Sequence, residues 1–399
     1  MNSTSNKTSP RQAWTDWLLV LAVGVLLWAP TADYFGHVDW SQPPDENRMM
    51  AAKPTLARVD VSGVRDYLAA TDTYFNDHFG FRKRLIRWCQ QWKQRLFHNK
   101  SLNLVITGQN GWFYIAERQM IDHYLGLEKF TPQQLQSWQR LLEKRRDWLA
   151  ARGIKYLFVV PPDKHSIYPE NLPTWLVKAT PANRRTKLDQ FMQFMKAHST
   201  VEVLDLREPL IAGKKFAPTY LHNDTHWNLY GGFLAAQELV KALSRQTPEL
   251  PPLRLEDFDW SNAPATGGDL ASMLSLHPPE KNNFVFAPKP PLVAPQIEVI
   301  TNIVRNWNAR DKAKVNKLVE NKNPTPKPVD LVIFHDSFAR PWWQFLGYSF
   351  HRCVFVWEDK EFNSKVIMDN HPQVVVNEML ERMFNTEDPD EMIAKDALP

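Results

Sequence analysis

The sequence predicts an α/β domain in which helices cover both faces of a mostly parallel central sheet. Short apolar runs alternate along the chain with longer amphipathic segments, and this alternation is typical of parallel strands joined by helices. The expected strands are residues 154–160, 201–206, 329–334, 353–357 and 373–377. The expected helices between them are residues 183–197, 229–245, 342–349 and 362–370. The result is a three-layer α/β/α arrangement.

The composition is that of a folded protein and argues against several function classes. Hydrophobic residues make up 43% of the 399 residues and charged residues 23%, which is ordinary for a globular chain. The net charge of +4 is too small to indicate a nucleic-acid partner. The two cysteines, Cys89 and Cys353, exclude a disulfide framework and lack metal-ligand spacing. We therefore expect no cofactor, no metal and no nucleic acid.

The N-terminal region predicts export from the cytoplasm. Residues 1–12 form a polar tail, expected to be disordered and cytoplasmic, with Lys7 and Arg11 before the fourteen-residue apolar run 17–30. Positive charge before such a run favours an N-terminus that stays inside. We expect residues 13–30 to be a single-pass signal anchor in the inner membrane, with the remaining chain in the periplasm. A cleaved signal peptide is one alternative, because the run also has signal-peptide length, and a buried helix of a soluble protein is the other.

A linker, a helix and a turn are expected between the anchor and the first long strand. Residues 31–60 contain several prolines and are expected to be an extended linker, and the catalytic domain is expected to span residues 61–399. Residues 61–99 have helical periodicity, and residues 108–113 are expected to be a turn that enters a short strand.

A further helix and an insertion complete the expected elements. The helix starts after the N-cap Thr131, with Pro132 at its first position, and ends at Gly153. Residues 246–328 are rich in proline and show no sustained period, so we expect them to form an irregular insertion.

Two polar islands carry the predicted chemistry. The first is His222-Asn-Asp224-Thr-His226-Trp227, and the second is Phe334-His335-Asp336-Ser337-Phe338, at the end of the apolar run 329–334. A serine nucleophile needs a base to take its proton and a carboxylate to orient that base. We expect Ser337 to be the nucleophile, His226 the base and Asp224 the orienting carboxylate.

Two other interpretations of these islands stay open. Asp224 and the Asp336-Ser337 pair are good helix N-caps and could serve only that purpose. His222, Asp224 and His226 alternate along the chain and have side chains that bind zinc or harder ions, although no fourth ligand is marked by spacing.

Other polar and aromatic residues are expected at the same edge of the sheet. Ligands of α/β proteins bind outside the carboxyl ends of the strands, and several such residues follow those ends closely. The predicted substrate-binding residues are Lys164, His165, His335, Arg340, Trp342 and Trp343.

Several longer motifs resemble one protein family. Besides the Asp224-x-His226 and Asp336-Ser337 pairs, four stretches carry the resemblance: Glu46-Asn-Arg48 ahead of Lys53-Pro54, residues 74–82 (YFNDHFGFR), Gly108-x-x-Gly111-Trp112-x-Tyr114, and residues 160–173 (VPPDKHSIYPENLP). In order and spacing the chain resembles the SGNH-hydrolase-like proteins of alginate and exopolysaccharide O-acetylation, and more closely the membrane-anchored J type than the X type.

The resemblance implies a function and partners. It implies an SGNH-like fold, a triad of Asp224, His226 and Ser337, and O-acetyl transfer to a secreted polysaccharide. It also implies a membrane-bound O-acyltransferase that supplies acetyl groups. His335 stands where the wider superfamily often has glycine. A carbohydrate acetyl esterase and a non-catalytic polysaccharide-binding assembly subunit are the alternatives.

Overall fold

The computed structural model describes most of the chain, in segments separated by gaps. The described residues are 14, 17–21, 23–24, 51–56, 58–78, 104–116, 118–274, 276–300, 316–324, 328–357, 362–396 and 398. By its internal contacts the chain divides into two units. The first comprises Met1–His98 with Ser272–Leu276, and the second comprises Asn99–Ala271 with His277–Pro399.

The first unit contains the helix α2, Val61–His78. Asp60 caps it, since its Oδ1 accepts hydrogen bonds from Gly63 N (2.6 Å) and Ser62 Oγ (2.8 Å). This helix confirms the first part of the helix expected at 61–99, whose second part lies outside the described residues. In the part of the chain that the structure describes, no helix is both long and apolar enough for a membrane crossing. The anchor predicted at 13–30 lies largely outside that part.

A seven-stranded sheet forms the centre of the second unit. Its order is β4 (Val203–Asp205), β3 (Lys155–Val160), β13 (Val374–Glu378), β11 (Asp330–His335), β12 (Arg352–Trp357), β10 (Asn316–Glu320) and β9 (Gln296–Ile300). The first five strands are parallel, whereas β10 pairs antiparallel with both β12 and β9. All five predicted strands are therefore confirmed as the parallel part of a mixed sheet.

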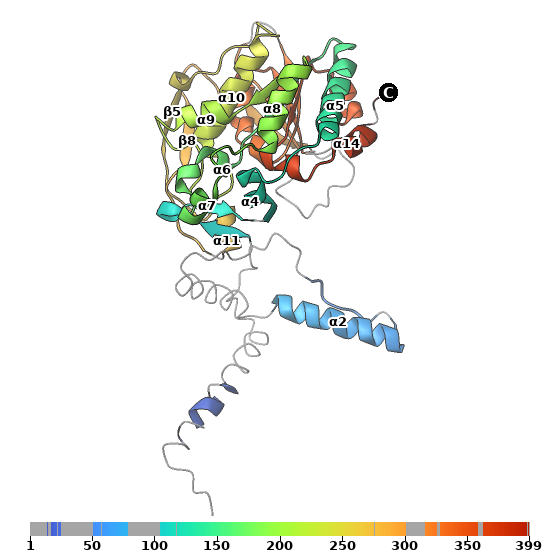
Figure 1. Ribbon diagram of the computed structural model, residues 1–399, viewed down its shortest axis with the longest axis vertical. Coiled ribbons are helices and arrows are strands. Elements are labelled where there is room, and N and C mark those ends of the chain that lie inside the picture. The colour runs from blue at the N-terminus through green and yellow to red at the C-terminus, as the bar shows by residue number, and fades with distance from the viewer. Residues whose placement is uncertain are drawn as a thin grey trace, which may run out of the picture. The chain divides into compact units, whose positions relative to one another are not determined.

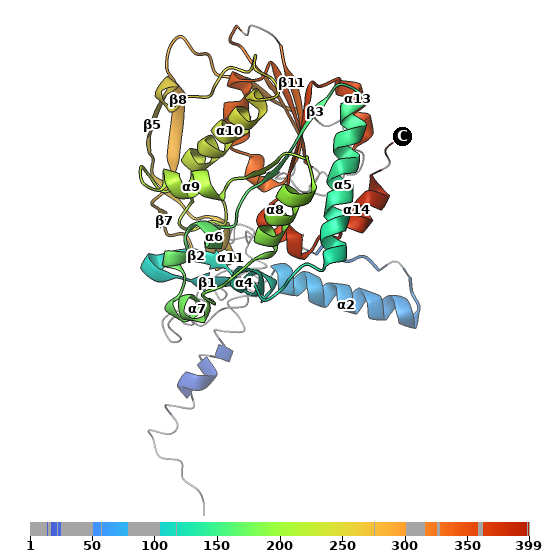
Figure 2. The same cartoon turned by 45° about the horizontal axis from the view of Figure 1, so that its top comes forward.

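Helices cover both faces of this sheet and bury two apolar layers. On one face lie α9 (Arg207–Gly213), α10 (Leu229–Ser244) and α12 (Trp342–Phe345), and on the other α5 (Pro132–Ala150), α8 (Lys187–His198), α13 (Ser364–Asn370) and α14 (Pro389–Lys395). Figure 1 and Figure 2 show α9 and α10 on one side of the sheet and α5, α8 and α14 on the other. The predicted three-layer α/β/α arrangement is confirmed.

The predicted start of α5 is also confirmed. Thr131 Oγ1 accepts a hydrogen bond from Gln134 N (3.2 Å), and Gln134 Oε1 accepts one from Thr131 N (2.9 Å). This reciprocal pair is a capping box, which satisfies two backbone donors at the helix start. Gly153, with φ of 74°, follows the end of the helix, where the left-handed conformation favours glycine.

The remaining elements are short. They are β1 (Val105–Thr107), η1 (Gln109–Gly111), β2 (Phe113–Ile115), α4 (Arg118–Leu125), α6 (Lys164–Ile167), η2 (Pro169–Asn171), α7 (Thr174–Ala179), η3 (Leu255–Asp257), α11 (Asp269–Met273), η4 (Ser337–Ala339), η5 (Leu346–Tyr348) and η6 (Glu381–Asn385). The turn and strand predicted at 108–113 correspond to η1 and β2.

The expectation of an irregular insertion at 246–328 is wrong in one respect. This segment supplies β9 and β10 to the central sheet and forms two separate two-stranded antiparallel sheets. These pair β5 (Phe258–Asn262) with β8 (Phe284–Pro288), and β6 (Ala265–Thr266) with β7 (Pro279–Glu280). Most of its prolines lie between strands or at strand ends, where they remove no ladder hydrogen bond. Proline content alone therefore concealed the strands.

A buried ion pair joins α5 to the C-terminal end of α14. Arg145 Nε and Nη2 donate to Asp396 Oδ2 (2.6 Å) and Oδ1 (2.9 Å). The side chains of Arg145 and Asp396 are 2% and 0% exposed, so each charge depends on the other for neutralisation. Such a two-bond pair fixes the relative position of the two helices.

We expect Asp396→Ala to lower the free energy of unfolding by about 3–5 kcal/mol, because it leaves the Arg145 guanidinium buried and unpaired. Denaturant unfolding followed by circular dichroism measures the change. The matched control is Asp390→Ala, which removes the exposed pair with Arg140 and should cost less than about 1 kcal/mol. Equal effects of the two substitutions would contradict the prediction.

Candidate active site

Ser337 lies in a tightly held turn at the carboxyl end of β11. Asp336 precedes it, and its Oδ1 accepts from Phe338 N (2.8 Å) while its Oδ2 accepts from Leu380 N (3.3 Å). Asp336 N donates in turn to Glu378 Oε2 (2.7 Å). The turn is thus bonded to the end of the neighbouring strand β13, and Ser337 remains partly exposed.

The structure brings the three predicted catalytic side chains together. Ser337 Oγ lies 2.7 Å from His226 Nε2, although the two residues are 111 positions apart in sequence. His226 Nδ1 donates to Asp224 Oδ1 at 2.6 Å, and His226 N donates to the same oxygen at 3.0 Å. This continuous chain of hydrogen bonds leaves Nε2 as the acceptor of the serine proton.

Asp224 is held in its charged form. Burial would raise the pKa of this carboxyl, but hydrogen bonds from the ring and backbone of His226 and from Asp269 N outweigh burial and lower it. A carboxylate at Nδ1 fixes the tautomer of the imidazole and stabilises the imidazolium that forms when His226 takes a proton. The side chains of His226 and Asp224 are 23% and 16% exposed, so a ligand can reach the site.

A buried lysine holds the backbone of the Asp-x-His loop. Lys164 Nζ donates to three carbonyl oxygens, those of Phe113 (2.8 Å), His222 (3.0 Å) and Asp224 (2.9 Å). Burial lowers the pKa of Lys164 to about 7, while the three acceptors match the three N–H donors of an ammonium group. Lys164 therefore positions Asp224 through its backbone.

The backbone N–H groups of the same loop are also hydrogen-bonded. Glu280 Oε1 accepts from His222 N (2.9 Å), and its Oε2 accepts from Asn223 N (2.8 Å). At the other end of the loop, Trp227 Nε1 donates to Phe338 O (2.9 Å). This last bond ties the loop directly to the turn that carries Ser337.

A second carboxylate, which the sequence analysis missed, lies beside the triad. Asp269 Oδ1 accepts from Thr225 N (2.7 Å), its Oδ2 accepts from the Thr225 hydroxyl, and its own N–H donates to Asp224 Oδ2 (2.8 Å). Asp269 Oδ2 lies 3.6 Å from His226 Nδ1. The available sequence signal was the pair of glycines that precedes this aspartate.

Four of the predicted substrate-binding residues are buried, and their contacts are internal. Lys164 is 3% exposed, His165 2%, His335 0% and Trp342 0%. His165 Nε2 bonds the carbonyl of Ile115 at 3.0 Å, and burial lowers the pKa of His165 to about 3. In this structure these side chains support the site from within and present no surface to a substrate.

Burial also explains how His335 fits beside Ser337. Its Nδ1 donates to the carbonyl of Asp336 at 2.6 Å, and its ring lies among Phe355 and Trp357. Burial lowers the pKa of His335 to about 4, against the opposing effect of the hydrogen bond to Asp336. The ring is therefore neutral and lies in the core.

Arg340 and Trp343 are the two predicted substrate-binding residues that keep partial exposure. The Arg340 guanidinium carbon lies 5.0 Å from the ring centre of Trp357, and Lys317 Nζ lies 5.2 Å from that of Trp343. Both residues remain predicted substrate contacts.

The metal interpretation of the first island does not match the geometry of His222. Its Nδ1 lies 3.1 Å from Asn223 Oδ1 and its Nε2 lies 3.1 Å from Asn110 O. The group spaced closely enough for a metal ion, within the described ranges, is Asp224, His226 and Asp269. In that group both ring nitrogens of His226 are already hydrogen-bonded, one to Asp224 and the other to Ser337.

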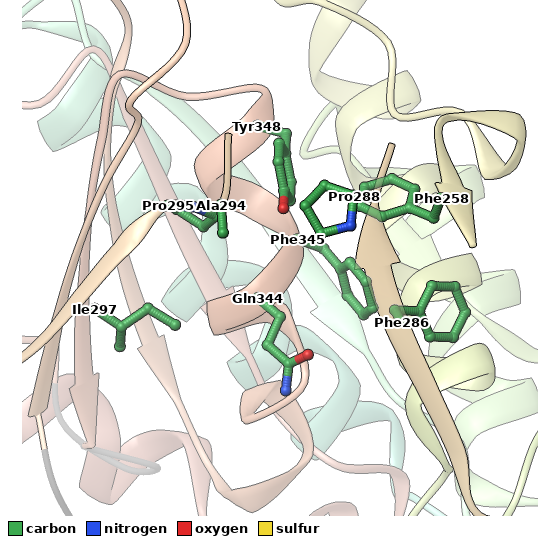
Figure 3. Close-up of a pocket in the computed structure, with 9 residues that line it drawn as sticks. All are labelled: Phe258, Phe286, Pro288, Ala294, Pro295, Ile297, Gln344, Phe345 and Tyr348. Carbon is green, nitrogen blue, oxygen red and sulfur yellow. The ribbon is translucent and has the colours of Figure 1, made fainter. Parts of the chain in front are cut away.

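An apolar pocket elsewhere in the second unit lacks the chemistry of the triad. Figure 3 shows Phe258 and Phe286 of the β5–β8 sheet facing Phe345 and Tyr348. Neither a carboxylate nor a histidine lines it. We therefore assign the chemistry to the triad and not to this pocket.

Comparison with known proteins relates most of this unit to one family. Residues 105–348, more than half of the chain, match the family described as "SGNH hydrolase-like domain, acetyltransferase AlgX". A protein from Pseudomonas syringae pv. tomato named "Probable alginate O-acetylase AlgJ" is 28% identical over 222 residues, which cover 55% of this chain and 53% of that protein. A protein of the same name from Pseudomonas putida is 26% identical over 278 residues, covering 70% and 66%.

The chain spans about half the length of the first relative and about two thirds of the second. Among solved structures, a DHHW family protein from Eubacterium siraeum has a TM-score of 0.52 at 14% identity, covering 74% of this chain and 97% of that one. This likeness shows a shared fold.

We expect Lys164→Met to reduce the rate at which Ser337 reacts with a fluorophosphonate probe by about 10-fold or more. The change also leaves three carbonyls without their donor, at a cost of roughly 1–3 kcal/mol for each buried group. Probe labelling and denaturant unfolding measure the two effects. Lys241→Met, which alters an exposed lysine on α10, is the control, and labelling of the Lys164 variant at the control rate would contradict the prediction.

We expect His335→Leu to flatten the loss of stability on acidification between pH 6.5 and pH 4. In this window the unfolded chain binds a proton at His335 and the folded chain does not, so stability falls as the pH falls, by about 1.4 kcal/mol per pH unit for one such group. His165 contributes in the same direction. Denaturant unfolding at several pH values across this range tests the prediction, with His198→Leu, at an exposed histidine, as the control. An unchanged dependence of the free energy of unfolding on pH in the His335 variant would contradict the prediction.

Proposed function

Because the chain belongs to the SGNH hydrolase-like, AlgX-type acetyltransferase domain family, we propose that it is an O-acetyltransferase acting on a secreted polysaccharide. The reaction proceeds through an acetyl-serine intermediate at Ser337. The observation that carries this proposal is the unbroken hydrogen-bond chain from Ser337 through His226 to Asp224.

The first half of the reaction forms the intermediate. Ser337 Oγ attacks the carbonyl carbon of an acetyl donor while its proton passes to His226 Nε2. The imidazolium, stabilised by Asp224, then gives this proton to the departing donor oxygen. The products are acetyl-Ser337 and the protonated leaving group.

The second half transfers the acetyl group. A sugar hydroxyl gives its proton to His226 Nε2 and attacks the acetyl carbon, and the bond from that carbon to Ser337 Oγ breaks. Ser337 Oγ takes the proton back from His226, which restores the free site. Water in place of the sugar hydroxyl would make the same site an acetyl esterase.

The negative charge that develops on the acetyl oxygen needs a hydrogen-bond donor. η4 begins at Ser337, and the next amide, Phe338 N, is already bonded to Asp336. We assign the Ser337 N–H as one oxyanion donor, because the first N–H groups of a helix lack partners within it.

The proposal extends to partners and location. The basic tail and apolar run of residues 1–30 support an inner-membrane anchor with the catalytic domain in the periplasm. A membrane-bound O-acyltransferase would supply acetyl groups there, and the polysaccharide would accept them. Arg340 and Trp343, which keep partial exposure at the same edge of the sheet, are the side chains proposed to contact the sugar.

We expect Ser337→Ala to abolish acetyl transfer, with a loss of roughly 10³-fold or more, because no other group replaces the nucleophile. Full-length protein is incubated with 4-nitrophenyl acetate, with and without oligouronate, and acetyl on protein and sugar is followed by mass spectrometry. Ser244→Ala, at the end of α10, is the matched control.

The outcomes separate the candidate functions. Acetyl-Ser337 with acetylated sugar supports transfer, and acetate release that does not depend on sugar supports an esterase. Absence of acetyl-Ser337 in the wild type would exclude both enzymatic functions and leave a non-catalytic, polysaccharide-binding role.

A further inference from the structure

Asp269 contacts every residue of the Asp-x-His motif. Both of its carboxylate oxygens accept from Thr225, one from the backbone N–H and one from the hydroxyl. Its own N–H donates to Asp224 Oδ2 at 2.8 Å, and its Oδ2 lies 3.6 Å from His226 Nδ1. The Asp224 carboxylate is therefore held on one oxygen by His226 and on the other by Asp269.

The backbone before Asp269 is shaped for this close approach. Gly267 and Gly268 have φ values of 88° and 126°, which favour glycine. A Cβ atom at Gly268 would lie 2.3 Å from the carbonyl oxygen of Asn223, so another residue there would push the two segments apart. Ala271 N donates to the same carbonyl at 3.1 Å. Two independent features, the glycine pair and the Asp269 side chain, thus hold residues 267–271 against the Asp-x-His loop.

We propose that Asp269 is a positioning residue for acyl transfer at Ser337, a fourth member that acts through Asp224, Thr225 and His226. It holds the Asp224 carboxylate and Thr225 so that His226 stays aligned with Ser337, and it places a second negative charge beside the ring. This inference rests on the proposed function, since it concerns the same site.

The second charge acts when the proton moves. Once His226 has taken the Ser337 proton, two carboxylates lie close to Nδ1 of its positive ring, Asp224 at 2.6 Å and Asp269 at 3.6 Å. Opposite charges at this distance attract, and partial burial reduces the screening by water. Asp269 therefore stabilises the positively charged ring that forms before acetyl-serine.

The same geometry predicts how the site responds to acid. The charged groups facing Asp269 are Asp224, His226, Lys164 and Arg382. Burial and the neighbouring charge of Asp224 raise the pKa of Asp269. Its protonation on acidification therefore removes a negative charge from beside the ring of His226.

The test compares two substitutions of Asp269 with a matched control. Asp269→Asn keeps an oxygen for Thr225 N but loses the charge, whereas Asp269→Ala loses both. Asp259→Asn changes an exposed aspartate of the same insertion, 79% exposed and 3.6 Å from Lys289. The readouts are the rate of acetyl-Ser337 formation from 4-nitrophenyl acetate across the pH range, kcat and KM for transfer to oligouronate, and the unfolding midpoint.

We expect Asp269→Asn to lower the acylation rate and kcat about 10- to 100-fold, with little change in KM. The acid limb of its pH profile should move to lower pH, because asparagine cannot take up the proton that Asp269, whose pKa is raised by burial, binds on acidification. Asp269→Ala should be slower still, and Asp259→Asn should match the wild type. If Asp269→Ala does not fold, the Asp269→Asn variant alone tests the role of Asp269.

Two results would overturn the inference, and they are distinguishable. Wild-type protein that acetylates Ser337, together with an Asp269→Asn variant of equal rate and unshifted acid limb, would show that Asp269 is merely structural. Wild-type protein that never acetylates Ser337 would overturn the proposed function and, with it, the role of Asp269.

Discussion

The ammonium group of Lys164 is the contact on which the geometry of the site depends. It binds carbonyls of Phe113 in β2 and of His222 and Asp224 in the Asp-x-His loop, and so joins these two segments to α6, which carries Lys164. Because this charge is buried, it is stable only while all three carbonyls face it. These bonds hold the backbone of the Asp-x-His loop in place. The side-chain hydrogen bonds from Asp224 to His226 and from His226 to Ser337 depend on that backbone position.

The insertion between α10 and β11 also holds the backbone of the Asp-x-His loop. Lys164 satisfies carbonyls of the loop, whereas Glu280 and Asp269, both from the insertion, satisfy its N–H groups. A loop held on donors and acceptors alike has few ways to rearrange. This segment therefore belongs to the active site even though it carries no member of the triad.

The parts predictable from sequence are those with a local signal. The apolar run ending at Phe334 marked β11, and the polar pair after it placed Ser337 at the strand end. The burial of His165 and His335 had no such signal, because it results from contacts with other strands and helices. Asp269 was not predicted for the same reason, because its partners lie about 45 residues away in the sequence. Asp269 itself lies in a stretch whose prolines suggested irregular structure. Only the adjacent glycines hinted at a close approach.

Charge balance explains how so many carboxylates coexist around one serine. Asp163, Asp269 and Asp336 all lie within reach of the positive charge of Arg382, whose guanidinium donates to Asp163 Oδ1 at 2.5 Å. Burial raises the pKa of Asp336, so without a nearby cation this carboxyl would tend to bind a proton and lose its role as double acceptor in the serine turn. The positive charge of Arg382 thus favours the ionised forms of Asp163 and Asp336 against the effect of burial. The alignment of Ser337 with His226 follows from this balance as much as from any single hydrogen bond.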